Sequence, residues 1–462
     1  MRSLRQVDET VHFTQEATLD ALGQTITRVR IESLLQSLNC VEQRTRKLTM
    51  VLAVLICIAM NLFTEEAIDD VLAKLLQGPR FLRPDNDRVP ASASAICQRR
   101  RQLGVKPLVT LFREICRPLA IPTTQDAFLC GWRLMAIDGT TEDVPDTPAN
   151  AKYFGRPHGG RGDGAFPQVR GVYLCECGPH AICDAGFWPL VSSERAGGLR
   201  MLRSVDPGML VTWDRGFYSF DMFARTRQRR AHFLARVPSQ VCLKPLRRLP
   251  DGSYLAHIQP SAKQRRRRGE RLLVRVIEYT MDDPARPGYR ERHRLITSLL
   301  NPVLYPALTL ACAYHERWEV EITIDEVDTH QRQPRQPLRS RTPIGVLQEL
   351  YGLLLAHYAI RAVMHEAAMR AKIAPDRLSF INTIRILRNA VFEAQIVAKE
   401  QQAKWYDCLL RDIGREVLPV RDHRCNPRVV KRKMSPFDLK RDKHRHWIQP
   451  TKSFADAIVI LI

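Results

Sequence analysis

Two short apolar runs, each followed directly by an aspartate, constrain the fold of this chain more than any other feature. Leu134–Ile137 precedes Asp138, and Met209–Trp213 precedes Asp214. Runs of this length and composition predict buried β-strands with each carboxylate at the strand end. If the strands are parallel neighbours, both acids lie at the sheet edge where α/β proteins commonly bind ligands. Either aspartate alone is better explained as a turn or capping residue.

The segments around these runs alternate between strand and helix patterns. We expect a hairpin at Val169–Cys177 and His180–Trp188, a helix, the second aspartate's strand, a helix at Phe220–Arg229 and a strand at His232–Val237. Strand, hairpin, helix, strand, helix and strand is the order of a ribonuclease-H-like α/β unit. Short alternating runs between residues 239 and 304 predict a β-rich insertion.

Composition and pattern divide the chain into four regions. Residues 1–125 predict an all-helical N-terminal domain. Residues 126–238 and 305–400 predict the α/β core, which the β-rich segment 239–304 interrupts. Residues 401–462 form a basic C-terminal region. Its last segment, ADAIVILI, is either an added strand or an atypical terminus.

Two helices have clear start signals. Ser92 and Gly104 bound a short helix that carries three consecutive arginines, residues 99–101. That cluster is either a nucleic-acid contact or a solvated basic face. Thr342 and Pro343 supply the N-cap and first position of a long apolar helix.

The charge balance limits the classes of partner. The chain has 71 Lys and Arg against 49 Asp and Glu, a formal net charge of +22. Such a surplus favours a polyanion, because each neutralised phosphate releases counterions. An anionic membrane and a merely basic protein are the alternatives. No apolar run is long enough to cross a bilayer and no signal peptide is evident, so we expect a cytoplasmic protein. Neither zinc spacing nor a glycoside hydrolase fits the sequence.

A third acid, Glu321, lies on a helix expected to begin near Pro306. At 100° per residue, one line of this helix holds Tyr314, Arg317, Trp318, Glu321, Asp325 and Asp328. A neighbouring stripe, expected to be the packing face, holds Ala313, Val320, Ile324 and Val327. Glu321 is therefore expected beside the core, whereas Glu316, Glu319 and Glu326 point elsewhere. The alternative is an ordinary surface ion pair with Arg317.

Several motifs together resemble one family. The segment YHERWEVE, residues 314–321, resembles the Y-x2-R-x3-E-x6-K signature of DDE transposases from bacterial insertion sequences, in particular the insertion-sequence-4 family. The AIDGT and WDRGF blocks, which hold the two aspartates, are similar to that family, as are Tyr153-Phe-Gly-Arg and Gly164-Ala-Phe-Pro-Gln. The likeness runs from about residue 20 to 445. The signature lysine would be residue 328, where this chain has Asp328; Arg332 or Arg335 are candidates to replace it.

The resemblance implies a DNA transposase that cleaves element ends and transfers the strands into target DNA by cut-and-paste transposition. It implies that Asp138, Asp214 and Glu321 are catalytic and hold two Mg²⁺ or Mn²⁺ ions. The implied partner is double-stranded DNA, both terminal inverted repeats and target, bound by a nucleoid-associated homodimer and by the helical N-terminal domain. The expected DNA contacts are Tyr314, Arg317, Trp318, Arg215, Arg99, Arg100, Arg101, Arg265, Arg266, Arg267, Arg268, Lys431, Arg432 and Lys433. The alternatives are a nuclease of the same fold and an inactive DNA-binding copy, of which Asp328 would be one sign.

Overall fold

The computed structural model describes residues 25–42, 48–77, 91–159, 162–260, 271–286, 288–332, 337–394, 396–419 and 448–461. The chain forms two compact units, each assembled from segments far apart in sequence. The first unit comprises Met1–Phe128, Met135–Ser204 and Glu319–Leu418, and the second comprises Leu129–Leu134, Val205–Trp318 and Pro419–Ile462. The architecture is mixed α/β, as the sequence predicts.

Antiparallel strands form the sheet of the first unit. β2 (Trp132–Asp143) pairs with β5 (Gln168–Glu176), which pairs with β6 (Ala181–Pro189), so the predicted hairpin is confirmed. The prediction that the first strand ends at Asp138 is wrong, because β2 pairs with β5 through Asp143. The two β-branched threonines after Gly139 favour an extended backbone and carry the strand onward.

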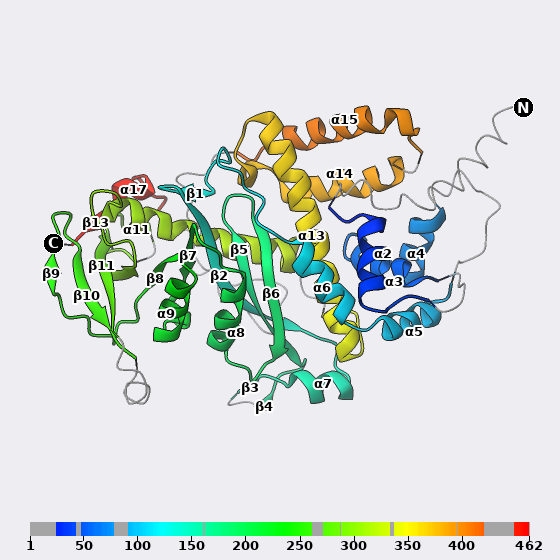
Figure 1. Ribbon diagram of the computed structural model, residues 1–462, viewed down its shortest axis with the longest axis horizontal. Coiled ribbons are helices and arrows are strands. Elements are labelled where there is room, and N and C mark those ends of the chain that lie inside the picture. The colour runs from blue at the N-terminus through cyan, green and yellow to red at the C-terminus, as the bar shows by residue number, and fades with distance from the viewer. Residues whose placement is uncertain are drawn as a thin grey trace, which may run out of the picture. The chain divides into compact units, whose positions relative to one another are not determined.

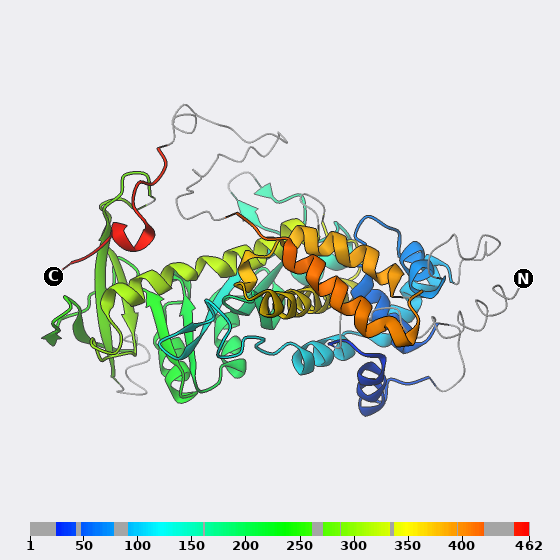
Figure 2. The same cartoon turned by 90° about the horizontal axis from the view of Figure 1, so that it is seen from above.

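Helices surround α13 (Pro343–Ala371) in the first unit. The predicted cap is confirmed, because the Thr342 side chain accepts a hydrogen bond from the Gly345 N–H, and Pro343 opens the helix. α13 packs against α3, α6, α14, α15 and β6 (Figure 1), and Figure 2 shows α14 and α15 beside it. The helices of this unit are α2 (Arg28–Ser37), α3 (Met50–Ala59), α4 (Ile68–Gln77), α5 (Ala93–Leu103), α6 (Lys106–Ile115), α7 (Pro148–Phe154), α8 (Glu194–Met201), α12 (Trp318–Asp325, whose first residue belongs to the second unit), α13, α14 (Phe380–Glu393) and α15 (Gln402–Arg415).

The second unit holds the strands from β7 to β13. β7 (Met209–Trp213), α9 (Phe220–Gln228) and β8 (His232–Arg236) follow in the predicted order, and β7 and β8 pair in parallel. From β8 the sheet continues through antiparallel strands in the order β12 (His293–Thr297), β11 (Leu272–Met281), β10 (Tyr254–Ile258) and β9 (Arg247–Arg248). β13 (Ile458–Ile460) pairs with β11, so the C-terminal segment contributes an added strand.

A buried arginine anchors this sheet to α11 (Ala307–Glu316). Arg275 on β11 is fully buried and donates hydrogen bonds to Ser253 Oγ at 2.8 Å and to the Tyr305 carbonyl at 2.6 Å. It also forms an ion pair with Asp251, which accepts the Ala307 N–H at 3.0 Å at the start of α11. The network therefore fixes the helix that carries Tyr314 against the strands.

Among the described residues, no helix is both long and apolar enough to span a bilayer.

Candidate active site

Asp214 follows a strand that fixes its position. All five residues of β7 are buried, and the chain turns at once into a short 3₁₀ helix, η4 (Arg215–Phe217). Asp214 caps this helix, because its Oδ1 accepts the Gly216 N–H at 2.8 Å. Asp214 is therefore a capping residue, as the sequence suggested for this aspartate taken alone. The carboxylate remains partly exposed at the end of the strand.

Three polar side chains of the second unit lie close to Tyr314, namely those of Asp214, Arg236 and Arg317. β7 and β8 pair in register, Trp213 with Ala235, so the next residues along the two strands are Asp214 and Arg236. Burial raises the pKa of the Tyr314 hydroxyl well above its usual range, and Arg317, Asp214 and Arg236 are close enough to act on it electrostatically. The Arg317 guanidinium lies over the Tyr314 ring, 5.8 Å from its centroid. The structure thus brings together three of the predicted residues.

Arg236 is a residue that the sequence analysis did not single out. A signal was present, because Arg236 comes directly after apolar residues of a buried strand, as Asp214 does. A polar residue at the carboxyl end of a buried parallel strand lies where α/β sheets present ligand-binding groups.

Asp138 belongs to the first unit and lies within β2. Its Oδ1 accepts the N–H of Gly139 at 2.8 Å, and the side chain is half-buried. Because side chains alternate along a strand, Asp138 and Glu142 share one face of β2. Glu142 is buried and forms an ion pair with Arg332.

Glu321 lies on a helix that differs from the prediction. The helix from Pro306 was predicted to continue to Asp328. Instead, α11 ends at Glu316, and α12 begins at Trp318. The Arg317 N–H bonds the Tyr314 carbonyl three residues back, which tightens the turn.

A π-helix, η5 (Glu326–Gln331), follows α12 directly. Its wider turn moves Asp328 off the line computed at 100° per residue. Of the predicted packing face, Ala313, Val320 and Val327 are buried and Ile324 is half-buried. Glu321 itself is half-buried.

Two sets of contacts hold α12 and η5 along the sheet of the first unit. Before Glu321, the Glu319 Oε2 accepts the Gly178 N–H at 2.5 Å, at the turn between β5 and β6. After Glu321, Asp328 lies beside Glu142 on β2. Glu321 therefore lies between two points of attachment to this sheet.

A buried ionic network reinforces the second attachment. Glu326 accepts hydrogen bonds from Arg361 on α13 (2.9 Å from Nε) and is 3.2 Å from both His180 and His357. Burial alone would raise the pKa of the Glu326 carboxyl, but Arg361 and His180 hold it well below its usual value. The sequence predicted only that Glu326 points away from the line that holds Glu321, and the structure places it in the core.

The arginine cluster on α5 is not the exposed face that both interpretations assumed. Arg99 and Arg100 are each 7% exposed. Arg99 pairs with Glu42, and Arg100 donates to Ser340 Oγ at 3.2 Å and to the Gly345 carbonyl. Of the three, Arg101 is exposed.

Several predicted DNA contacts lie outside the part that the structure describes. They are Arg265, Arg266, Arg267, Arg268, Lys431, Arg432 and Lys433, as well as the side chain of Trp318 and the candidate Arg335. Arg215 is described and is exposed directly after Asp214.

The donor chemistry of the three predicted carboxylates fits a divalent cation, because Mg²⁺ and Mn²⁺ prefer oxygen ligands. Among the described residues, no three His, Cys, Asp or Glu side chains form a group that could hold a metal ion.

Comparisons with known proteins point to one class. A family model described as "Insertion element 4 transposase N-terminal" matches residues 16–113, and one described as "Transposase DDE domain" matches residues 132–359. The chain is similar to "Transposase InsG for insertion sequence element IS4" of Escherichia coli (strain K12), 27% identical over 424 residues, which cover 89% of this chain and 92% of that protein. It is also similar to "Putative transposase InsZ" of the same strain, 28% identical over 137 residues, which cover 29% of this chain and 46% of that protein.

A cryo-EM structure of a piggyBac transposase synaptic complex with hairpin DNA covers 89% of this chain and 87% of that chain, with a TM-score of 0.40 and 12% identity. A score this low does not establish a shared fold.

The two matched models follow one another along the chain and define its class, a DNA transposase, which is an enzyme that cuts and joins DNA strands. The chain belongs to the insertion-element-4 family of DDE transposases, and the resemblance seen in its motifs is confirmed. DNA is its partner, and dependence on divalent metal ions is general to the class.

Proposed function

We propose that this transposase cleaves DNA at the ends of its element and joins the freed ends to target DNA by cut-and-paste transposition. Asp138, Asp214 and Glu321 are the catalytic carboxylates, and they belong to a ribonuclease-H-like core that spans residues 126–238 and 305–400. We further propose a β-rich insertion at residues 239–304 and a helical N-terminal domain at residues 1–125, the boundaries expected from the sequence. A homodimer on DNA, in the cytoplasm and associated with the nucleoid, is the proposed working form.

The grouping of Asp214 with Tyr314, Arg317 and Arg236 is the observation that carries this proposal. Two guanidinium groups and a phenol are donors suited to phosphate oxygens. A carboxylate among phosphate-binding groups would repel the phosphate unless a cation lay between them. A bound divalent ion explains why all four groups occur together.

The attachment of Glu321 supports the same proposal. Glu321 precedes Asp328 by about 10 Å along the helix axis. Asp138 precedes Glu142 by about 13 Å along β2. Asp328 lies beside Glu142, and Glu319 is held at the opposite end of the sheet, so the direction from Asp328 to Glu321 is the same as that from Glu142 to Asp138. Glu321 therefore lies toward the part of β2 that holds Asp138.

Two divalent ions held by these carboxylates would activate a water or 3′-hydroxyl nucleophile and stabilise the leaving oxygen of an in-line displacement. The protein groups have separate tasks. Arg317 and Arg236 bind non-bridging phosphate oxygens, and a guanidinium can do so through two parallel hydrogen bonds. Tyr314 keeps its proton at working pH, because burial raises its pKa, and it therefore donates a hydrogen bond to the phosphate.

Cleavage of DNA that carries the element's inverted repeats tests the proposal. We expect metal-dependent cleavage by the wild type, and a loss of roughly 10³-fold or more in Asp138→Asn, because a lost ligand removes several kcal/mol of charge stabilisation. Asp143→Asn is the matched control, since Asp143 lies on the same strand but on its other face. Equal activity of the two variants would contradict the assignment.

A joining assay separates the alternatives. Supplied with pre-cut 3′-hydroxyl ends and target DNA, a transposase yields joined product, whereas a nuclease of the same fold yields none. An inactive DNA-binding copy would bind the repeats and cleave nothing at any Mg²⁺ or Mn²⁺ concentration.

A further inference from the structure

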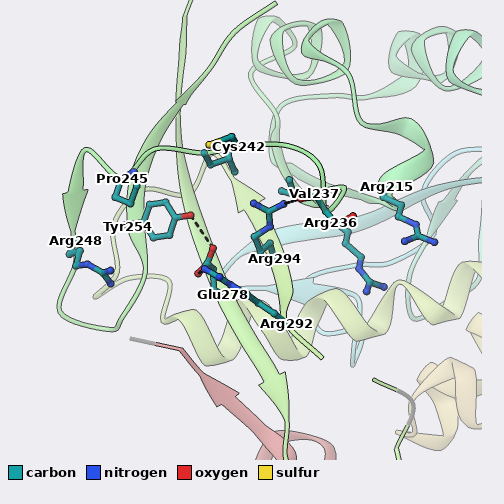
Figure 3. A pocket seen from close by; sticks show the side chains of 12 residues that line it. Arg215, Arg236, Val237, Cys242, Pro245, Arg248, Tyr254, Glu278, Arg292 and Arg294 are labelled. Carbon is teal, nitrogen blue, oxygen red and sulfur yellow. Dashed lines mark hydrogen bonds and ion pairs between the residues drawn. The ribbon is translucent and has the colours of Figure 1, made fainter. Parts of the chain in front are cut away.

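An arginine-rich pocket lies within the second unit, beginning one residue after Asp214. It has a volume of about 440 Å³, and among the residues that the structure describes, five arginines and one carboxylate line it (Figure 3). The charged residues are Arg215, Arg236, Arg248, Arg292, Arg294 and Glu278. Such an excess of positive charge in one cavity favours an anionic ligand.

The sheet register places two of these arginines on one face. Arg294 on β12 lies opposite Glu278 on β11, and Arg248 on β9 lies opposite Tyr254 on β10, with the side chains of all four on the same side of the sheet. Arg236 ends β8 opposite Leu295, so its side chain alternates to the other side, where it contacts His293. From β12 to β9 there are three strand spacings, about 14 Å at 4.8 Å each, which is long enough for more than one phosphate of a strand that rises about 3.4 Å per nucleotide.

The arginines are not equivalent. Arg294 stabilises the pocket wall, because it donates hydrogen bonds to the carbonyls of Val241, Pro238 and Ser239, each at 2.8 Å. Arg292 forms an ion pair with Glu278, yet its side chain is 65% exposed. The Arg292 guanidinium is therefore held by Glu278 and is still exposed to solvent.

The opposite ends of the pocket provide further cations. Arg215 and Arg248 are both exposed, and Figure 3 shows them on opposite sides of Glu278. Glu278 is itself held in place, since it accepts the Tyr254 hydroxyl at 3.1 Å. Among the described lining residues, the one carboxylate is thus neutralised by Arg292 and receives a hydrogen bond from Tyr254, so the pocket keeps its positive character.

We propose that this pocket binds the backbone phosphates of a single DNA strand, leading away from the phosphodiester that Asp214 serves. The inference rests on the proposed function, because the strand it holds is the one being cut. A volume of this size accommodates a small ligand or a few nucleotides of one strand, whereas an intact duplex is far too wide. Guanidinium forks match phosphate geometry, so the pocket grips the backbone without reading sequence.

The test measures binding of a fluorescent 12-nucleotide oligothymidylate by anisotropy in EDTA, with a second probe whose central linkages are uncharged methylphosphonates. We expect Arg248→Ala and Arg292→Ala each to weaken binding of the charged probe about tenfold and to reduce the salt slope by about 0.7. Neither variant should change binding of the uncharged probe. Arg247→Ala is the matched control, because Arg247 is an exposed neighbour on β9 that does not line the pocket.

The outcomes separate this inference from the proposed function. If Arg248→Ala binds both probes as Arg247→Ala does, while Asp138→Asn abolishes cleavage, the pocket assignment is overturned and the transposase mechanism stands. If Asp138→Asn still cleaves, the proposed function fails, whereas the binding comparison still tests the pocket. Tighter binding of inorganic tripolyphosphate than of the oligonucleotide, lost in Arg248→Ala, would make the ligand a free polyphosphate and overturn the proposal.

Discussion

Asp328 occupies the position of the signature lysine, and its surroundings explain how an acid is accommodated there. Its carboxyl is buried beside Glu142, and burial, then Glu142, raises its pKa well above the usual value. A protonated Asp328 can donate a hydrogen bond to Glu142. Arg332, a candidate to replace the lysine, is engaged in an ion pair with Glu142, and its side chain is 15% exposed. The local charge is therefore balanced within the protein.

This pair predicts a pH-dependent effect of Asp328→Asn on stability. In the unfolded chain an aspartate ionises near pH 4, whereas the folded protein holds the proton to a higher pH. The folded state thus binds more protons, and its stability falls as pH rises from about 4 through the folded pKa. Asparagine cannot ionise, so we expect its thermal midpoint to rise relative to the wild type between pH 5 and pH 8.

Asp412→Asn on α15 is the control for this comparison, because Asp412 has a side chain that is 59% exposed. Its midpoint difference from the wild type should be the same at both pH values. A pH-independent difference for Asp328→Asn as well would contradict a proton shared with Glu142.

Among the elements, η5 is tied to α13 by a buried ion pair. Its Glu326 and Arg361 on α13 are respectively 5% and 1% exposed. Burial of an ion pair is costly, but removal of one partner leaves an uncompensated buried charge, which costs more. The position of the π-helix, and with it that of α12, therefore depends on this pair.

We expect Glu326→Gln to lower the free energy of unfolding by about 3–5 kcal/mol, because Arg361 would remain charged and buried. Urea denaturation followed by circular dichroism measures this. Glu366→Gln is the control: the pair of Glu366 with Arg370 has side chains that are 44% and 48% exposed, and such surface pairs contribute about 0–1 kcal/mol. Equal losses in the two variants would mean that the buried network does not hold η5.

The start of α13 predicts a smaller effect. Thr342→Ala removes the acceptor for the Gly345 N–H and should cost about 1 kcal/mol of stability. Thr123→Ala, at an exposed position, should change the urea midpoint by much less. No difference between these variants would show that the hydroxyl cap contributes nothing to α13.

Elements with local signals were predictable from the sequence, and those set by distant contacts were not. The caps at Ser92 and Thr342 and the buried strand before Asp214 follow from a few adjacent residues. Burial of Arg100 depends on Ser340, far away in the sequence. The π-helix after Asp325 likewise depends on Arg361, so no sequence pattern within the helix predicts it.

The same limit applies to the site. Grouping of Tyr314 and Arg317 was predictable from their three-residue helical spacing, and Asp214 from its strand. Arg236 joins them through the parallel pairing of β7 with β8, which is a relation between strands that a linear pattern does not contain.

At the scale of the whole molecule, the net positive charge favours binding to DNA. The surplus is +22, and the arginines of the pocket are one part of it. The two units are each built from separated segments, so neither corresponds to one continuous stretch of the chain. The four regions predicted from composition remain a prediction about domains.

We expect DNA affinity to fall steeply with salt. If six or more phosphates are neutralised, the affinity for duplex DNA should drop by roughly 10³-fold or more between 50 and 200 mM salt. Fluorescence anisotropy with a fixed duplex across that range measures the slope. A nearly salt-independent affinity would contradict recognition through the phosphate backbone.

The short strand β13 has a consequence for solubility. It lies against Tyr279–Met281 of β11, beyond the point where β10 stops pairing with that strand. Exposed sheet edges act as templates for further strands. A chain shortened before Ile458 would uncover backbone donors and acceptors there, and a second copy could dock onto the bare edge, so that truncation at this position promotes self-association.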